Sequence, residues 1–185
     1  MEAAVARSRR RWPAAVAALV AVGFIAAMVW SGREPESRWL VKSETPGVLV
    51  VPPDRISRVE VTAAGRRLTF ERGAGGWTAG RGPVPPPLAA HLESSVKFMH
   101  VSAPVRVLAG EEYAHAALAE YGLDPPRYTV SLFAGDRLVL DAGFGVPNPQ
   151  KVLQYMRLRG HDEVHLMSRF VGQEWERVVD AAAAR

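Results

Sequence analysis

The longest feature in the pattern of apolar and polar residues is a stretch near the N-terminus without any charge. Residues 12–32 read WPAAVAALVAVGFIAAMVWSG, and these 21 residues would span about 31 Å as a helix, close to the thickness of a bilayer's hydrocarbon core. Trp12 and Trp30 stand near its ends, where aromatic side chains favour the membrane–water interface. The pattern predicts one transmembrane helix.

After this stretch, short segments alternate between apolar and polar side chains, as half-buried strands do. In residues 56–62, for example, Val59 and Val61 lie on one face, and Arg58 and Glu60 lie on the other. Turns are expected at 63–65 and 73–76. We expect strands or extended segments at 48–51, 56–62, 67–72, around Trp77, and at 101–108, 128–133, 138–142, 152–158 and 164–167, with helices at 88–99, 111–121 and 170–180.

Runs of strands with helices set between them, without strict alternation, favour an α+β fold with a mainly antiparallel sheet. We therefore expect such a sheet with two or three helices, preceded by one transmembrane helix. The expected organisation is a basic cytoplasmic tail at 1–11, the anchor at 12–32, a proline-containing linker at 33–53 and one extracytoplasmic α+β domain at 54–185. The expected core contains Leu68, Phe70, Trp77, Leu92, Val96, Leu123, Val130, Leu132, Leu138, Leu140, Tyr155 and Val164.

The charges beside the apolar stretch predict its orientation. Four arginines precede it within RSRRR, whereas the charges of REPESR after it are balanced. Because cytoplasmic flanks are enriched in Lys and Arg, we expect residues 1–11 in the cytoplasm and the domain outside it. The predicted protein is thus a single-pass signal-anchor protein of a bacterial inner membrane, with a periplasmic or otherwise extracytoplasmic domain. A cleaved signal peptide also has a basic start and an apolar stretch, and it is the alternative.

The amino-acid composition excludes several kinds of functional site. The sequence has no cysteine, which excludes disulfides, thiolate metal sites and cysteine nucleophiles. The net charge of +4 invites a nucleic-acid interpretation, but residues 1–38 hold six arginines against three glutamates, so most of the excess belongs to the anchor flanks. No nucleic-acid partner is predicted.

Several segments together resemble a bacterial family, domain of unknown function 4340. They are a hairpin of the form VEV…LTFERG…GGWT, then LAEYGLDPPRYTVSL, LVLDAGFG and YMRLRG…EVHLM, and they cover roughly residues 56–171, with 121–126 the most specific part. The resemblance implies an anchored envelope protein, similar in some members to an auxiliary component of gliding-motility-type ABC transporters. The family defines no catalytic residues, so none is carried over. Its usual leucine–glycine–acid corner is replaced at 142–147 by AGFGVP, which lacks the acid.

The segment 121–126 also has a plain physical interpretation. Gly122 can adopt the left-handed conformation that ends a helix, and Leu123 can then fold back onto the preceding turn. Pro125 and Pro126 prevent the helix from continuing. The segment is expected to be a structural corner between a helix and a strand, with a binding role as the less favoured alternative.

The candidate groups for chemistry do not form a recognised pattern. His161 and His165 are expected on a turn and a strand, about 13 Å apart, too far to share a metal. His91, His100 and His115 lack ligand spacing, and the glycines of 73–76 lack the Lys-Ser/Thr of a phosphate loop. Arg157 and Arg159 share a strand face, which is either solvated or a surface for an anionic partner. No catalytic, cofactor-binding or metal-binding residue is predicted, and no cofactor.

These observations favour a non-enzymatic membrane-tethered envelope protein, a scaffold or auxiliary subunit of an ABC-transporter-like membrane complex. Its expected partners are a membrane protein and, through residues 12–32, the lipid bilayer. The alternative is a module that binds an envelope polysaccharide or lipid, which an exposed aromatic cluster or a concave apolar pocket would favour. An enzyme is the third class, and it would require carboxylates or histidines that converge in a cleft.

Overall fold

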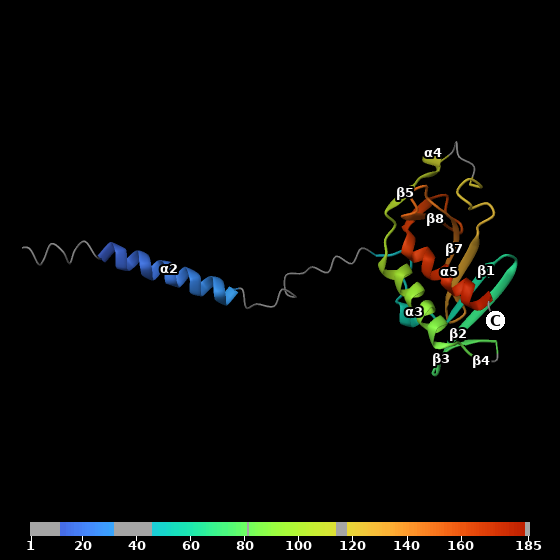
Figure 1. The fold of residues 1–185 in the computed structure, drawn as a ribbon, viewed down its shortest axis with the longest axis horizontal. Helices are drawn as coiled ribbons and strands as arrows, with labels where there is room; N and C mark the ends of the chain where they lie inside the picture. The colour runs from blue at the N-terminus through green and yellow to red at the C-terminus, as the bar shows by residue number, and fades with distance from the viewer. Residues whose placement is uncertain (1–11, 32–45, 81, 114–117, 184–185) are drawn as a thin grey trace, which may run out of the picture. The chain divides into compact units, whose positions relative to one another are not determined.

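The computed structural model describes residues 12–31, 46–80, 82–113 and 118–183, and the chain divides into two compact units, residues 1–43 and 44–185. In the first unit, helix α2 (Trp12–Ser31) is long and apolar enough to cross a membrane, a property that a signal sequence shares (Figure 1). The predicted apolar helix is therefore confirmed, while the direction in which it crosses a membrane stays a prediction.

The second unit is built on one antiparallel sheet. In the described part of the chain the sheet has nine strands, in the order β4-β3-β2-β1-β6-β7-β8-β9-β5. The strands are β1 (Arg58–Ala63), β2 (Arg66–Gly73), β3 (Gly76–Ala79), β4 (Gly82–Pro83), β5 (Arg106–Leu108), β6 (Tyr128–Ala134), β7 (Arg137–Pro147), β8 (Leu153–Leu158) and β9 (Val164–Ser168). This architecture confirms the α+β prediction with a mainly antiparallel sheet.

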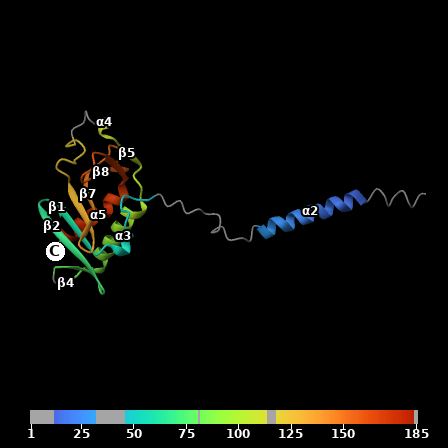
Figure 2. The same cartoon turned by 180° about the vertical axis from the view of Figure 1, so that it is seen from behind.

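Two long helices cover one face of the sheet, which we call the helix face (Figures 1 and 2). They are α3 (Pro86–Val101) and α5 (Arg169–Ala183), which pack against each other and are joined by a 2.8 Å contact between His91 Nδ1 and Glu174 Oε2. Shorter helices are η2 (Pro53–Arg55) and α4 (Gly110–Tyr113). The core between the helices and the sheet includes Val59, Leu92, Val130, Phe144 and Trp175.

Four local predictions are wrong, for identifiable reasons. Residues 48–51 form no strand, because Gly47 and Leu49 donate their N–H groups to the carbonyls of His100 and Met99 at the end of α3. Leu49 is buried, so the domain begins before residue 54, and the linker expected at 33–53 overlaps it. Of the helix expected at 111–121, α4 reaches only Tyr113 and residues 118–121 form a turn, while 114–117 lie outside the described residues.

The fourth wrong prediction concerns Leu138, which is expected in the core but is 47 % exposed. Leu132 pairs with Leu140, whereas Phe133 pairs with Leu138, so β7 contains one extra residue, Val139, at this point. Such a bulge shifts the alternation of side chains and turns Leu138 away from the helix face. Leu68 and Tyr155 are half-buried, and the nine other expected core side chains are buried.

A buried polar network fixes α5 on the sheet. Gln154, fully buried on β8, donates to the Gly145 carbonyl at 2.9 Å and accepts from Arg169 at 2.7 Å. Arg169 also pairs with Glu176 at 2.5 Å, and the Tyr128 hydroxyl donates to the Gly172 carbonyl at 3.0 Å. Burial raises the pKa of the Tyr128 hydroxyl, so it stays a proton donor. Because the Gln154 amide, the Arg169 guanidinium and the Tyr128 hydroxyl all have hydrogen-bond partners, the network stabilises the contact between helix and sheet.

Replacing Gly172 by Ala should lower the free energy of unfolding. The added Cβ would overlap Oε1 of Gln154, so the amide would have to move and give up its hydrogen bonds. Overpacking of this kind costs about 1–3 kcal/mol, more than the gain of up to about 1 kcal/mol that alanine brings to a helix over glycine. Urea-induced unfolding followed by circular dichroism measures the difference.

Gly75→Ala is the matched control, since a Cβ at that turn position would meet no other atom within 4 Å. In a Gln154→Ala background, Gly172→Ala should cost less, because the overlapping amide is gone. Equal unfolding midpoints for Gly172→Ala and Gly75→Ala would show that this packing account is wrong.

Candidate functional site

The face of the sheet opposite α3 and α5, which we call the open face, carries polar side chains in rows across the strands. One row joins Glu60 of β1, Ser131 of β6 and Asp141 of β7, and the backbone N–H of Arg159 continues it by bonding the Asp141 carbonyl. The next row contains Thr129, Gly143 and Arg157. Side chains in such rows are direct neighbours, so the register of the strands brings these groups together.

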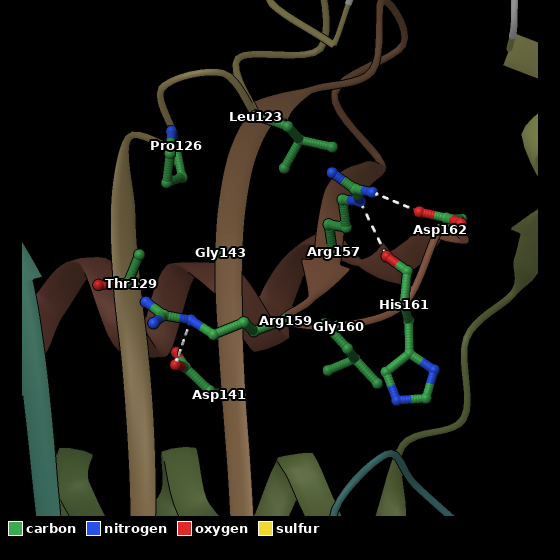
Figure 3. Close-up of a pocket in the computed structure, with 11 residues that line it drawn as sticks. Leu123, Pro126, Thr129, Asp141, Gly143, Arg157, Arg159, Gly160, His161 and Asp162 are labelled. Atoms are coloured by element: carbon green, nitrogen blue, oxygen red, sulfur yellow. Dashed lines mark hydrogen bonds and ion pairs between the residues drawn. The ribbon is translucent and has the colours of Figure 1, made fainter.

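A hollow of about 320 Å³ opens on these two rows (Figure 3). Gly143 forms its floor, because this position of the second row has no side chain. Leu123 and Pro126 form an apolar wall above it, and β8 with the turn that follows supplies the polar side. The residues that line it are Leu123, Pro126, Thr129, Asp141, Gly143, Arg157, Leu158, Arg159, Gly160, His161 and Asp162.

The charged groups of the hollow neutralise one another in pairs. Arg159 Nε lies 2.7 Å from Asp141 Oδ2, and the same carboxylate accepts a hydrogen bond from Ser131 at 3.2 Å. Arg157 donates to Asp162 and to the His161 carbonyl, each at 2.9 Å. Each pair joins a shielded group to an exposed one: the Asp141 side chain is 11 % exposed and that of Arg159 75 %, whereas the Arg157 side chain is 33 % exposed and that of Asp162 94 %.

The apolar wall depends on the corner at 121–126, which forms as its sequence predicts. Gly122 has φ +63°, its N–H donates to the Ala119 carbonyl, and the Leu123 N–H donates to the Leu118 carbonyl. These two bonds define the Schellman motif, which closes a helical turn with glycine in the left-handed conformation. The corner is a structural element and, at the same time, one wall of the hollow.

Glycines in β7 allow the corner to lie against the sheet. A Cβ on Gly145 would overlap the Tyr121 carbonyl, which accepts a 2.8 Å hydrogen bond from the Val146 N–H. A Cβ on Gly143 would come within 3.1 Å of the Pro126 ring. Tyr121 also stacks on Tyr155 of β8, with ring centroids 4.3 Å apart, and burial raises the pKa of Tyr155. The sequence segment AGFG therefore has a packing role under this corner.

The structure separates the histidines considered from the sequence. His161 lines the hollow, but its ring points away from Thr129 and Asp141 (Figure 3). His165 is buried on the helix face, where burial lowers its pKa, so the neutral form is favoured. His91 pairs with Glu174, His100 bonds the Leu49 carbonyl, and His115 lies outside the described residues. Among the residues that the structure describes, no three His, Cys, Asp or Glu side chains form a group suited to a metal ion.

The arrangement suits recognition of a polar ligand. Guanidinium groups, a carboxylate and the Thr129 hydroxyl offer donors and acceptors beside an apolar wall, a combination typical of sites that bind small polar molecules. A second hollow of about 310 Å³ adjoins it and shares Asp141, Leu158, Arg159 and His161. Sequence reasoning identified the shared strand face of Arg157 and Arg159, but not Asp141 as their neighbour, because that placement depends on pairing between distant strands.

In comparisons with known proteins, no protein-family model, no curated protein and no solved structure matches this chain. The resemblance to the domain of unknown function 4340 family therefore stays a prediction, and the site rests on its own geometry.

Proposed function

We propose that this chain is a non-enzymatic, membrane-tethered envelope protein whose domain serves as a scaffold or auxiliary subunit of a membrane complex. The observation that carries the proposal is α2, whose 20 residues include no charged side chain. None of the residues from Pro13 to Trp30 is buried by the rest of the protein. A helix that is apolar on every side is unfavourable in water, and a bilayer removes that cost. The same chain continues into a folded α+β domain.

The flanking charges support the orientation with residues 1–11 in the cytoplasm and the domain in the periplasm of a bacterial inner membrane. A domain held at a membrane meets integral membrane proteins at a raised local concentration, which suits an auxiliary subunit. The sequence resemblance supplies the most concrete version, an auxiliary of an ABC transporter. The charges of the hollow support a binding role over a catalytic one. Each guanidinium and each carboxylate is already held in an ion pair, which favours a fixed recognition surface over a reactive group.

Protease added to intact bacterial spheroplasts should digest the domain and leave only a short protected fragment that contains the N-terminus. The expected reason is that α2 crosses the membrane and residues 46–183 lie outside it. An epitope at the N-terminus, detected by immunoblotting, measures the fragment. Full protection of the domain would reverse the orientation, and a soluble product that lacks the N-terminal epitope would favour a cleaved signal peptide.

A second candidate function, a binding module for an envelope saccharide, is favoured by the hollow beside Gly143. Its volume of about 320 Å³ falls at the lower end of the range for small-molecule sites. Arg157 and Arg159 present planar donors, which suit hydroxyl and carboxylate oxygens alike. Leu123 and Pro126 provide the apolar surface against which the carbon face of a sugar ring can lie.

If this candidate is correct, Arg159→Gln should weaken saccharide binding by about tenfold, because the guanidinium that pairs with the Asp141 carboxylate is lost beside the ligand. Two probes, neutral cellotetraose and anionic tetragalacturonate, distinguish hydroxyl from carboxylate recognition, and nuclear magnetic resonance titration gives the affinities. Arg137→Gln is the control, since Arg137 is an exposed arginine at the far end of β7. Equal affinities for the two variants, or no binding of either probe, would exclude this candidate.

A further inference from the structure

An exposed apolar surface surrounds the point at which the chain enters the domain. Seven large apolar side chains are exposed in the described part of the domain, and five of them lie in this region. Exposed apolar side chains on soluble domains are usually scattered singly, so a cluster of five is unusual. We call these five the attachment face: Val50, Val101, Val105, Val107 and Phe170.

Backbone and ring contacts join the five residues into one surface. Val50 and Val101 follow Leu49 and His100, which are linked by a 2.8 Å hydrogen bond from the His100 ring to the Leu49 carbonyl. Phe170, at the start of α5, makes an edge-to-face contact with Phe98, one turn before the end of α3.

Strand β5 completes the surface. The Val105 N–H donates to the Leu166 carbonyl, and Val107 pairs with His165, whose side chain lies on the helix face. Val107 therefore projects to the same side as the ends of α3 and α5, and Val105, 61 % exposed, directly precedes the strand. Figure 1 shows β5 beside the upper end of α3, at the side where residues 46–51 enter the domain.

The length of the intervening chain suggests what covers this surface. Fourteen residues, 32–45, separate α2 from Pro46. Fourteen residues span at most about 50 Å in any conformation, comparable with the roughly 40 Å diameter of a compact domain of this size. Once α2 lies in a bilayer, Pro46 stays within about 50 Å of the lipid, so the surface around it can reach the bilayer.

The rim of the surface suits lipid as well. Lys97, exposed one helical turn before Val101, lies beside the apolar residues. Lysine at the border of an apolar surface can bury its stem while its ammonium group remains among lipid headgroups. Arg106 contributes little charge, because it pairs with Glu112 at 2.5 Å.

We propose that the attachment face rests on the surface of the bilayer in which α2 is anchored, with Val105 and Phe170 among the residues that contact lipid. This inference rests on the proposed function, since it requires α2 to span the membrane. The domain would then have a fixed orientation relative to the bilayer.

The absence of cysteine permits a clean test, because single cysteines can be labelled without background. The full chain, reconstituted in phosphatidylcholine vesicles, would carry an environment-sensitive fluorophore at Val105→Cys or Phe170→Cys. Thr69→Cys and Thr78→Cys, at exposed positions of β2 and β3, are matched controls. Lipids with a nitroxide near the headgroup should quench the probes on the attachment face at least about threefold more strongly than the control probes.

Resistance to carbonate extraction, measured on the same vesicles, separates the two proposals. Extraction of the chain would show that α2 is not an anchor, and both proposals would fail. An anchored chain with equal quenching at all four positions would overturn only the lipid contact. Energy transfer between labelled copies in place of quenching would assign the attachment face to a second copy of the chain and would also overturn it.

A charge introduced into the surface provides an independent check. Val107→Asp should reduce the quenching of a probe at Phe170→Cys by about threefold or more, because an exposed valine is replaced by a group that avoids lipid. Thr69→Asp, on an exposed position of β2, should leave the quenching unchanged. Circular dichroism confirms that both variants are folded, and equal quenching in the two would contradict the proposal.

Discussion

The pairing of β1 with β6 is the contact on which the rest of the domain depends. It joins residues 58–63 to residues 128–133, and it unites the N-terminal hairpins with the C-terminal strands in one sheet. Val59, Val61, Val130 and Leu132 lie at this junction on the helix face, and none of them is exposed. Without the junction the sheet would separate into two smaller sheets. Neither of them alone could cover the apolar faces of both α3 and α5. The position of the candidate hollow follows from the adjoining registers of β6 with β7 and of β7 with β8, which its rows cross.

Much of the fold could be predicted from local pattern, and the reasons are visible in particular residues. Val59 and Val61 alternate with charged neighbours, so their strand and its inward face were readable. Gly122 ends a turn because glycine tolerates its positive φ, a property that one residue reveals alone. Leu138 was misassigned because the extra residue in β7 depends on the partner strand. Residues 48–51 were misassigned because their hydrogen-bond partners lie at the end of α3, about 50 residues away.

The candidate site shows the same division between local and distant information. Arg157 and Arg159 can be assigned to one polar face from the sequence, because side chains two residues apart in a strand lie on the same side of the sheet. Their carboxylate partner Asp141 and the apolar wall at Leu123 and Pro126 come from other segments, and only the assembled sheet places them together. Gly143 and Gly145 give no chemical signal in the sequence. Their importance comes from what packs above them, since the corner at 121–126 occupies the space of their missing side chains.

The bulge at Val139 has a consequence for how this domain can vary. It lies near the tip of the β6–β7 hairpin. There it interrupts the alternation of side chains between the two faces of the sheet, so the tip and the rest of β7 follow different registers. The strand beyond it keeps Leu140, Ala142 and Phe144 toward the helices independently of what the tip does. The exposed side chains of Asp136 and Arg137 at the tip can therefore change without moving the core or the hollow, which makes these two positions the natural place in this sheet for sequence drift or attachment of a reporter.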